Sequence, residues 1–173
     1  MSSFCVRWRI VSGQRLSAPV LKPASGSHKV HAQLLSQLPF ALTGAQQRVG
    51  VELRHDLSRA VPMHRLLQGD VGSGKTIVAF LAMVEAVDAG YQSALMAPTE
   101  ILAEQHYRTL RQTLEVLGLN VALLRGSDKA ALKKTQVTHL ASGQIQVAIG
   151  THALIQKGVT FKNLGLAVVD EQH

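Results

Sequence analysis

A glycine-rich stretch carries the clearest chemistry in this sequence. The phosphate-binding template known as the P-loop is matched at every fixed position by Gly69-Asp70-Val71-Gly72-Ser73-Gly74-Lys75-Thr76. Glycines let backbone amides approach phosphate oxygens, and a helix that begins at Lys75 adds its own unpaired N–H groups. Lys75 would supply a mobile positive charge for the outer phosphates, and the Thr76 hydroxyl could hold Mg²⁺. The stretch therefore predicts a nucleoside triphosphate site; the alternative is a glycine-rich turn that caps a helix.

Two adjacent acidic residues near the end of the sequence form the second candidate. Asp170 and Glu171 directly follow an apolar run, Leu166-Ala167-Val168-Val169, that predicts a buried strand. Nucleotide hydrolysis needs one carboxylate to orient Mg²⁺ and another to position the attacking water. We assign the metal to Asp170 and the water to Glu171, so that Lys75, Asp170 and Glu171 are the catalytic candidates. The alternative is a strand that ends in two solvated acids.

Short apolar segments alternate with helical patterns along most of the chain, and this alternation must position both candidates. It indicates parallel βαβ units with helices on both faces of a sheet, so the predicted fold class is α/β. Strands are predicted at 65–68, 93–97, 121–124, 145–149 and 166–169. Helices are predicted at 30–38, from a cap at Thr43 to Leu57, at 77–89 and 99–117, and from a cap at Asp128 to about residue 141.

Composition and charge limit the remaining possibilities. The 173 residues suffice for one domain with a core, and 46% hydrophobic with 17% charged residues is typical of a globular protein. No apolar run approaches the ~18 residues of a membrane span, and the single Cys5 excludes an internal disulfide. The net charge of +7 is uneven, because six of the 18 basic residues but no acidic residue precede Glu52. A basic segment suits a polyanionic partner, or it is a solvated tail.

The first 38 residues differ from the rest. Pro19, Pro23 and the run Ser25-Gly26-Ser27 interrupt any long regular element. We predict that residues 1–38 are a basic, poorly ordered segment or the end of a preceding domain, and that residues 39–173 form the nucleotide-binding domain. An Arg-rich organelle transit peptide is a less favoured alternative for the segment, because no amphipathic helical pattern is evident.

Further segments resemble the DExH-box helicases of superfamily 2. The tetrad Asp170-Glu171-Gln172-His173 is similar to the DExH box, and Phe40-Ala41-Leu42-Thr43-Gly44-Ala45-Gln46 resembles the Q motif. The resemblance implies a RecA-like P-loop NTPase domain that binds ATP, with Mg²⁺ held between Thr76 and Asp170. It also implies that Gln46 reads the adenine edge and that Phe40 is a candidate for stacking.

Three more segments resemble motifs that contact the DNA backbone in this superfamily. Ala97-Pro98-Thr99-Glu100 looks like motif Ia, Gly126-Ser127 like motif Ib and Gly150-Thr151-His152 like motif Ic. The contacts implied would use loop hydroxyls and helix-terminal amides. His106, which follows motif Ia, is expected to be structural or exposed. The DNA-binding candidates are Pro98, Thr99, Glu100, Gly126, Ser127, Thr151 and His152.

Within the superfamily, the sequence resembles the RecG family of bacterial ATP-dependent helicases, which remodel branched DNA at replication forks and recombination intermediates. The resemblance rests on the P-loop, residues 97–106 and 150–154, and the DExH box. Transcription-repair coupling factors are similar but usually differ at the positions of Ser73 and Gln172. The resemblance implies DNA as the partner, no membrane, and a bacterial cytoplasmic, nucleoid-associated location.

The same resemblance implies that the sequence covers most of one motor lobe of a longer protein and ends after the DExH strand. In such lobes the next strand lies between the P-loop strand and the DExH strand. We therefore expect a gap in the sheet, an unstable chain, weak nucleotide binding and negligible turnover. The alternatives are a self-contained P-loop enzyme such as a small kinase, and a truncated, non-enzymatic remnant.

Overall fold

The computed structural model describes residues 2–7, 29–59, 64–69 and 74–172. Within these residues, strands and helices alternate from the second strand onward, as the sequence predicts. The strands are β1 (Ser2–Arg7), β2 (His64–Gly69), β3 (Gln92–Met96), β4 (Val121–Leu124), β5 (Val147–Gly150) and β6 (Leu164–Gln172). The helices are α1 (Lys29–Gln37), α2 (Gly44–Leu57), α3 (Lys75–Asp88), α4 (Glu100–Val116), α5 (Ala130–Ser142) and the short 3₁₀ helix η1 (His152–Ile155).

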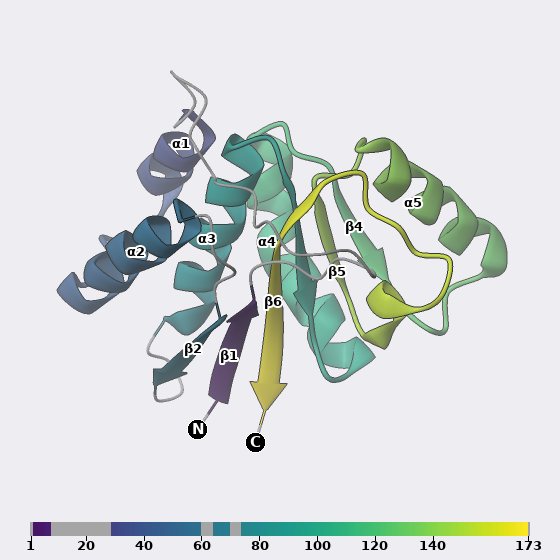
Figure 1. The fold of residues 1–173 in the computed structure, drawn as a ribbon, viewed down its shortest axis with the longest axis horizontal. Helices are drawn as coiled ribbons and strands as arrows, with labels where there is room; N and C mark the ends of the chain where they lie inside the picture. Colours follow the sequence, from purple (N-terminus) through teal and green to yellow (C-terminus); the bar gives the residue numbers. More distant parts are fainter. Residues whose placement is uncertain (1, 8–28, 60–63, 70–73, 173) are drawn as a thin grey trace.

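The described strands form one six-stranded sheet in the order β2-β1-β6-β3-β5-β4 (Figure 1). The neighbouring strands β6, β3, β5 and β4 are parallel. β1 runs antiparallel to both β2 and β6, so β2 shares the direction of the parallel strands. The predicted α/β fold is confirmed, with one antiparallel strand inserted in an otherwise parallel sheet.

The position of β1 corrects the expectation of a gap in the sheet. Ser2 lies opposite Gly69 on one side and Gln172 on the other, and Arg7 lies opposite His64 and Ala167. The backbone groups that β2 and β6 turn toward each other are therefore paired through β1 (Figure 1). The prediction that the chain is unstable depended on unpaired backbone groups between β2 and β6. Because β1 pairs with both strands, the structure does not support that prediction.

Two elements of the first 38 residues belong to the same structure as the rest. β1 is part of the sheet, and α1 packs on α3. Asp88 at the end of α3 accepts hydrogen bonds from the backbone amides of Val30 and His31, at 3.3 and 2.8 Å, and so caps α1. The boundary at residue 38 stays a prediction, but the described residues on both sides of it pack together.

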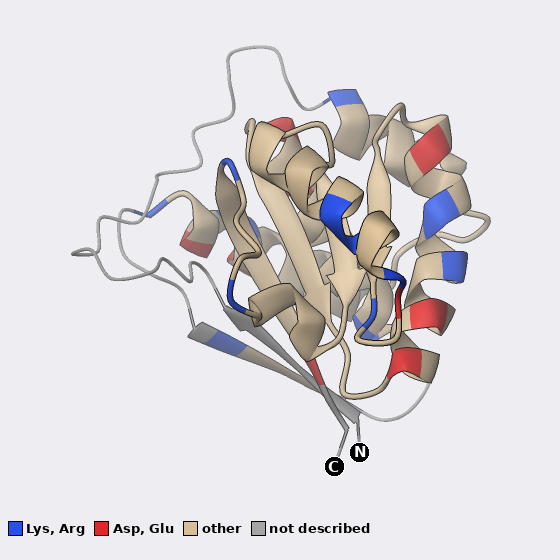
Figure 2. Ribbon diagram, turned by 90° about the vertical axis from the view of Figure 1, so that its right-hand side faces the viewer, with Lys and Arg blue, Asp and Glu red and all other residues tan. Residues whose placement is uncertain are grey.

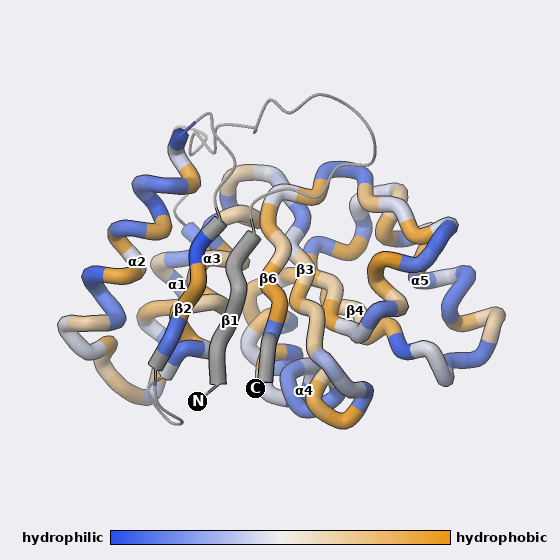
Figure 3. Tube along the Cα trace, turned by 60° about the horizontal axis from the view of Figure 1, so that its bottom comes forward, coloured by the Kyte–Doolittle hydropathy of each residue, from blue (hydrophilic) through white to orange (hydrophobic). Residues whose placement is uncertain are grey.

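Alternate residues of the strands supply two hydrophobic cores. Leu95, Ile149 and Val168 face the core that contains α3 and α4, whereas Ala94 and Ala148 face the core that contains α5 and η1. The trace is correspondingly hydrophobic along β3 and much of β6, and alternates in hydropathy along α2 and α5 (Figure 3). Helices therefore cover both faces of the sheet, as predicted.

The structure tests the predicted helix ends individually. Thr43 caps α2 as predicted, and α3 and α4 are followed by Gly90 and Gly118 in left-handed conformations. The predicted cap at Asp128 is wrong: Lys129 is the residue before α5, and it makes no side-chain cap. Asp128 accepts hydrogen bonds from Arg125 instead, because that arginine lies within reach in the same turn.

Charge lies mainly at the periphery. Lysine, arginine, aspartate and glutamate gather on the outer helices and loops, and the middle of the sheet is almost entirely uncharged (Figure 2). None of the helices in the described part of the chain has the length and apolar character needed to cross a membrane. The middle of the sheet is thus buried and apolar, and the charged residues lie at its edges and on the outer helices.

Candidate nucleotide and nucleic-acid site

The predicted site residues gather at one edge of the sheet. Because all strands except β1 share one direction, the loops that follow them open at the same, carboxyl, edge. α3 begins six residues after the last residue of β2, and Asp170 lies near the end of β6. The loops after β3, β5 and β4 contain the three groups of DNA-binding candidates. In the order of the sheet, the nucleotide candidates therefore lie on one side and the DNA candidates on the other.

The described end of the P-loop is a left-handed glycine at the start of a helix. Gly74 has φ of 73° and is the N-cap of α3, a conformation that disfavours other residues. The first helical bond of α3 runs from the Val78 amide to the Gly74 carbonyl, so Lys75 and Thr76 occupy the helix terminus, where anions bind well. Lys75 is buried and Thr76 half-buried. Asp70, Val71, Gly72 and Ser73 lie outside the described residues, and their assignments stay predictions.

The Q-motif glutamine lies beside this glycine. Gln46 and Thr43 form a capping box: the Gln46 Oε1 accepts from the Thr43 amide at 2.9 Å, and Thr43 Oγ1 accepts from the Gln46 amide at 3.2 Å. The Nε2 of Gln46 packs so closely on Gly74 that a Cβ there would collide with it. The cap of α2 thus places Gln46 at the P-loop. Phe40 is 53% exposed, and its stacking role stays a prediction.

Asp170 has one oxygen paired and one available. It is only 4% exposed, and its Oδ2 lies 2.8 Å from Nε2 of His106. Its Oδ1 is buried and has no hydrogen-bond partner among the described residues. A buried carboxylate oxygen without a donor is costly unless a cation or ligand satisfies it, so the acid fits Mg²⁺. The neighbouring Glu171 lies in β6, but its side chain is outside the described residues.

Other ligands of such a cation would come largely from outside the protein. The part of the chain that the structure describes contains no group of three or more His, Cys, Asp or Glu side chains that could hold a metal ion. Mg²⁺ commonly keeps several waters and binds through one or two protein ligands together with substrate phosphates. Thr76 and Asp170 would form a ligand set of that kind, and their role as ligands stays a prediction.

His106 is the site residue that sequence reasoning missed. The sequence predicts a structural or exposed residue; His106 is half-buried on α4, which fits the structural alternative, but its contact with Asp170 is not predicted. Its spacing was a usable signal, because Ala103, three residues before it, and Leu110, four residues after it, are both buried. A residue between them lies on the covered face of the helix.

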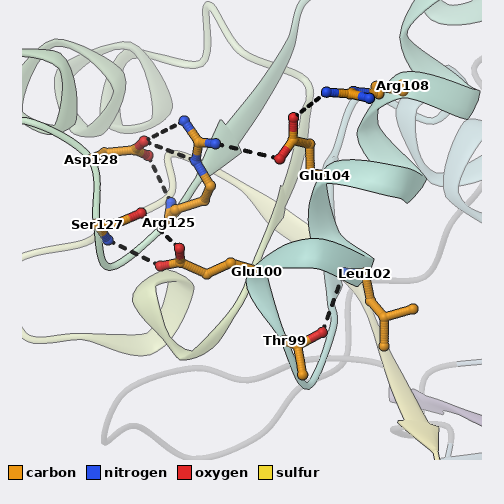
Figure 4. A network of polar contacts seen from close by, with 8 residues as sticks. All are labelled: Thr99, Glu100, Leu102, Glu104, Arg108, Arg125, Ser127 and Asp128. Atoms are coloured by element: carbon orange, nitrogen blue, oxygen red, sulfur yellow. Dashed lines mark hydrogen bonds and ion pairs between the residues drawn. The ribbon is translucent and has the colours of Figure 1, made fainter.

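Glu100 and Ser127 bring motif Ia and motif Ib together. The Oε1 of Glu100 accepts from the Ser127 amide at 3.0 Å, and its Oε2 accepts from the Ser127 hydroxyl at 2.7 Å (Figure 4). The hydroxyl, followed by the amide, lowers the pKa of Glu100 below its ordinary value of 4.5. Thr99, the N-cap of α4, accepts from the Leu102 amide at 3.3 Å. The first turn of α4 therefore holds the loop that follows β4.

Arg125, whose role the sequence leaves unexplained, reinforces the same loop. Its Nη2 and Nε lie 2.9 and 3.0 Å from Oδ1 of Asp128, and its Nη1 lies 3.7 Å from Glu104 of α4. Its backbone amide also donates to Asp128, at 2.8 Å. Glu104 in turn accepts from Arg108 (Figure 4). This chain of ion pairs gives the loop after β4 a second attachment to α4.

The remaining DNA candidates occupy neighbouring positions at the same edge. Pro98, Thr99 and His152 are exposed, and Thr151 is half-buried immediately before η1. Gly150, before Thr151, has no room for a side chain, because a Cβ would collide with the Leu124 carbonyl. The Gly150 carbonyl also accepts from the Ala97 amide at 2.8 Å. These contacts hold the loops after β3, β4 and β5 close together, and DNA contact by their residues stays a prediction.

Comparison with known proteins places this geometry in a family. Residues 46–173 match the sequence profile of the DEAD/DEAH box helicases. The ATP-dependent DNA helicase RecG of Aquifex aeolicus is 57% identical over 139 residues, which are 80% of this chain and 18% of that protein. RecG of Mycobacterium bovis is 48% identical over 181 aligned positions, covering 97% of this chain and 25% of that protein.

A solved structure agrees with these matches. The structure of RecG bound to a three-way DNA junction superposes with a TM-score of 0.72 and 51% sequence identity, over 79% of this chain and 19% of that one. The chain thus spans 18% and 25% of the length of the two curated relatives described above. The predicted RecA-like fold and the resemblance to RecG helicases are confirmed.

Proposed function

This chain belongs to the DEAD/DEAH box helicase family, and we propose that it forms the ATP-binding lobe of a RecG-type helicase that acts on branched DNA. The relatives described as ATP-dependent DNA helicases support the use of ATP. The RecG structure on a three-way junction supports branched DNA as the partner. The family match argues against the alternative of a small kinase.

One arrangement carries the proposal. The left-handed Gly74 leads directly into Lys75 and Thr76 at the start of α3, and the buried Asp170, near the end of β6, has an oxygen that no described residue contacts by a hydrogen bond. A helix terminus with a lysine favours phosphate, and an available carboxylate oxygen favours the accompanying cation. Both are supplied at the same edge of the sheet.

Each residue then has a chemical task. Lys75 and the amides at the start of α3 would bind the outer phosphates, while Gln46, held beside Gly74 by its capping box, would read the adenine edge. Thr76 and Asp170 would hold Mg²⁺, and Glu171 would position the attacking water. When bound, Mg²⁺ neutralises charge that develops on the transferred phosphoryl group.

DNA would lie along the loops after β3, β5 and β4, beside the nucleotide. Thr99 and Thr151 supply hydroxyl groups there, whereas the hydroxyl proton of Ser127 is already donated to Glu100. The amides at the start of α4 add a helix terminus that favours phosphate. Contacts of this kind bind the DNA backbone and do not read the base sequence. They are therefore suited to a protein that recognises the shape of a junction. A bacterial, nucleoid-associated location follows as part of the proposal.

Binding of a fluorescent ADP analogue to the 173-residue chain in the presence of Mg²⁺ tests the proposed nucleotide site. We expect saturable binding that Lys75→Ala weakens by at least about tenfold, since a charge-assisted phosphate contact is lost. Lys157→Ala is the matched control, because Lys157 is exposed and lies outside the nucleotide candidates. Equal binding by the Lys75→Ala chain, or no binding by the unsubstituted one, would contradict the proposal.

A further inference from the structure

His106 of α4 contacts Asp170 near the end of β6, and the tasks assigned to the nucleotide-site residues so far give His106 no role. His106 and Asp170 are 64 positions apart, with side chains 13% and 4% exposed, and their polar atoms meet at 2.8 Å. Withdrawing both groups from water is costly unless the contact is well formed. α4 packs on the core through Ala103, Leu110 and Leu114, whereas His106 contacts the polar Asp170.

The direction of the hydrogen bond follows from the chemistry of the acid. An ionised carboxylate only accepts hydrogen bonds, so Nε2 of His106 must carry the proton that points at Oδ2 of Asp170. The contact holds one carboxylate oxygen and leaves Oδ1, which has no partner in the described part of the chain. A carboxylate held through one oxygen has its other oxygen fixed in direction.

We propose that His106 is a positioning residue that orients the Asp170 carboxylate so that Oδ1 meets the nucleotide-bound Mg²⁺. The inference rests on the proposed function, because Asp170 is the assigned metal ligand. His106 itself touches neither metal nor nucleotide in this assignment. Outer partners of metal ligands act in this way: they fix the orientation of the ligand, and their loss typically lowers metal affinity by about 10–100-fold.

The anchoring of α4 supports this role. Its first turn is held by the Thr99 cap and by the two bonds between Glu100 and Ser127. His106 lies less than two turns farther along the same helix, which limits how far its ring can move. The residue that orients the acid therefore stands on a rigid element, as a precise metal site requires.

The test compares nucleotide binding with and without Mg²⁺ in three variants of the 173-residue chain. His106→Leu removes the donor, His106→Gln keeps an N–H donor at the same number of bonds from the backbone, and His55→Leu makes the same change at an exposed position on α2. A fluorescent ADP analogue is titrated in EDTA, and Mg²⁺ is then titrated at fixed nucleotide. Thermal unfolding of each variant shows that it is folded.

We expect all variants to bind the nucleotide equally in EDTA, within about twofold. His106→Leu should raise the Mg²⁺ concentration at half-effect by about 10–100-fold, His106→Gln should restore most of the response, and His55→Leu should match the unsubstituted chain. An unchanged Mg²⁺ midpoint in a folded His106→Leu chain would overturn the proposal. Equal loss in His106→Gln would also overturn it, because the N–H would then not be what matters.

The two possible failures can be distinguished. A chain that binds no nucleotide in EDTA or in Mg²⁺ would overturn the proposed function, and with it the role of His106. A chain that binds nucleotide, responds to Mg²⁺ and ignores the loss of His106 would leave the proposed function in place. Only the assignment of His106 as a positioning residue would then be wrong.

Discussion

Glu100 and Ser127 lie 27 positions apart in the sequence and are joined by two hydrogen bonds at the carboxyl edge of the sheet (Figure 4). The sequence predicts both as DNA-binding residues. Both carboxylate oxygens of Glu100 are occupied by Ser127, and a negative charge repels phosphate. We therefore expect Glu100 to position the loop of Ser127 for DNA, and expect the hydroxyls and amides nearby to make the contact.

The first prediction concerns the pH at which this contact is lost. Donation from Ser127 lowers the pKa of Glu100 below 4.5, so its contribution to stability is present above the ordinary pKa. That contribution is lost as the pH falls through the lowered value. An NMR titration of the Ser127 amide should show a midpoint below 4.5, and Ser127→Ala, followed at the Gly126 amide, should move it back up. Thr109→Ala removes a hydroxyl elsewhere on α4 and should leave the midpoint unchanged.

The second prediction separates positioning from DNA contact. Glu100→Gln keeps an oxygen that can accept from Ser127 but removes the negative charge. Affinity for a forked DNA duplex, measured by fluorescence anisotropy at fixed low salt, should stay equal or rise, by up to a few-fold, since removing an anion near phosphate is favourable. Glu100→Ala loses the acceptor and should weaken binding. A tenfold loss in Glu100→Gln would contradict the expectation that removing this negative charge does not weaken DNA binding.

The third prediction concerns the glycine that begins α3. Gly74→Ala forces a side chain into a left-handed conformation, at a cost of about 1–2 kcal/mol, and into collision with Gln46. We expect nucleotide affinity to fall at least about tenfold, because either α3 or Gln46 must move. Gly118→Ala is a close control: Gly118 has φ of 75° and nothing within 4 Å of its added Cβ. It should lower stability similarly and leave nucleotide binding intact, and equal effects of the two would contradict the prediction.

The fourth prediction tests the inserted strand. Val6 of β1 lies opposite Arg65 on one side and Val168 on the other, and proline at this position removes a ladder hydrogen bond from an interior strand. We expect the unsubstituted chain to unfold in one cooperative thermal transition. Val6→Pro should reduce the free energy of unfolding by about 1–3 kcal/mol more than Val6→Ala does, because Val6→Ala also removes the valine side chain but keeps the amide. Identical transitions in the proline variant would show that β1 does not complete the sheet.

Local patterns predicted much of this structure. The predicted strands became β2 through β6 within a few residues of their predicted bounds. For β3, β5 and β6 the reason is that buried parallel strands need continuous hydrophobic sequence. Thr43 was predicted as a cap because it precedes an apolar i, i+4 stripe, and the structure adds the reciprocal bond from Gln46. The cap predicted at Asp128 is wrong because the Asp128 carboxylate accepts hydrogen bonds from the nearby Arg125 instead of from the amides of α5.

The sequence by itself determined the fold class, and it predicted phosphate binding by Lys75 and Thr76 and a metal-binding acid at Asp170, because spacing along one segment carries the pattern for each of them. Tertiary structure alone decided the contacts between distant segments: His106 with Asp170, Glu100 with Ser127, and β1 between β2 and β6. Which partners meet across 27 or 64 positions depends on strand order and helix packing. No single segment carries that information, because burial and hydrogen bonding are satisfied only when the whole sheet has formed.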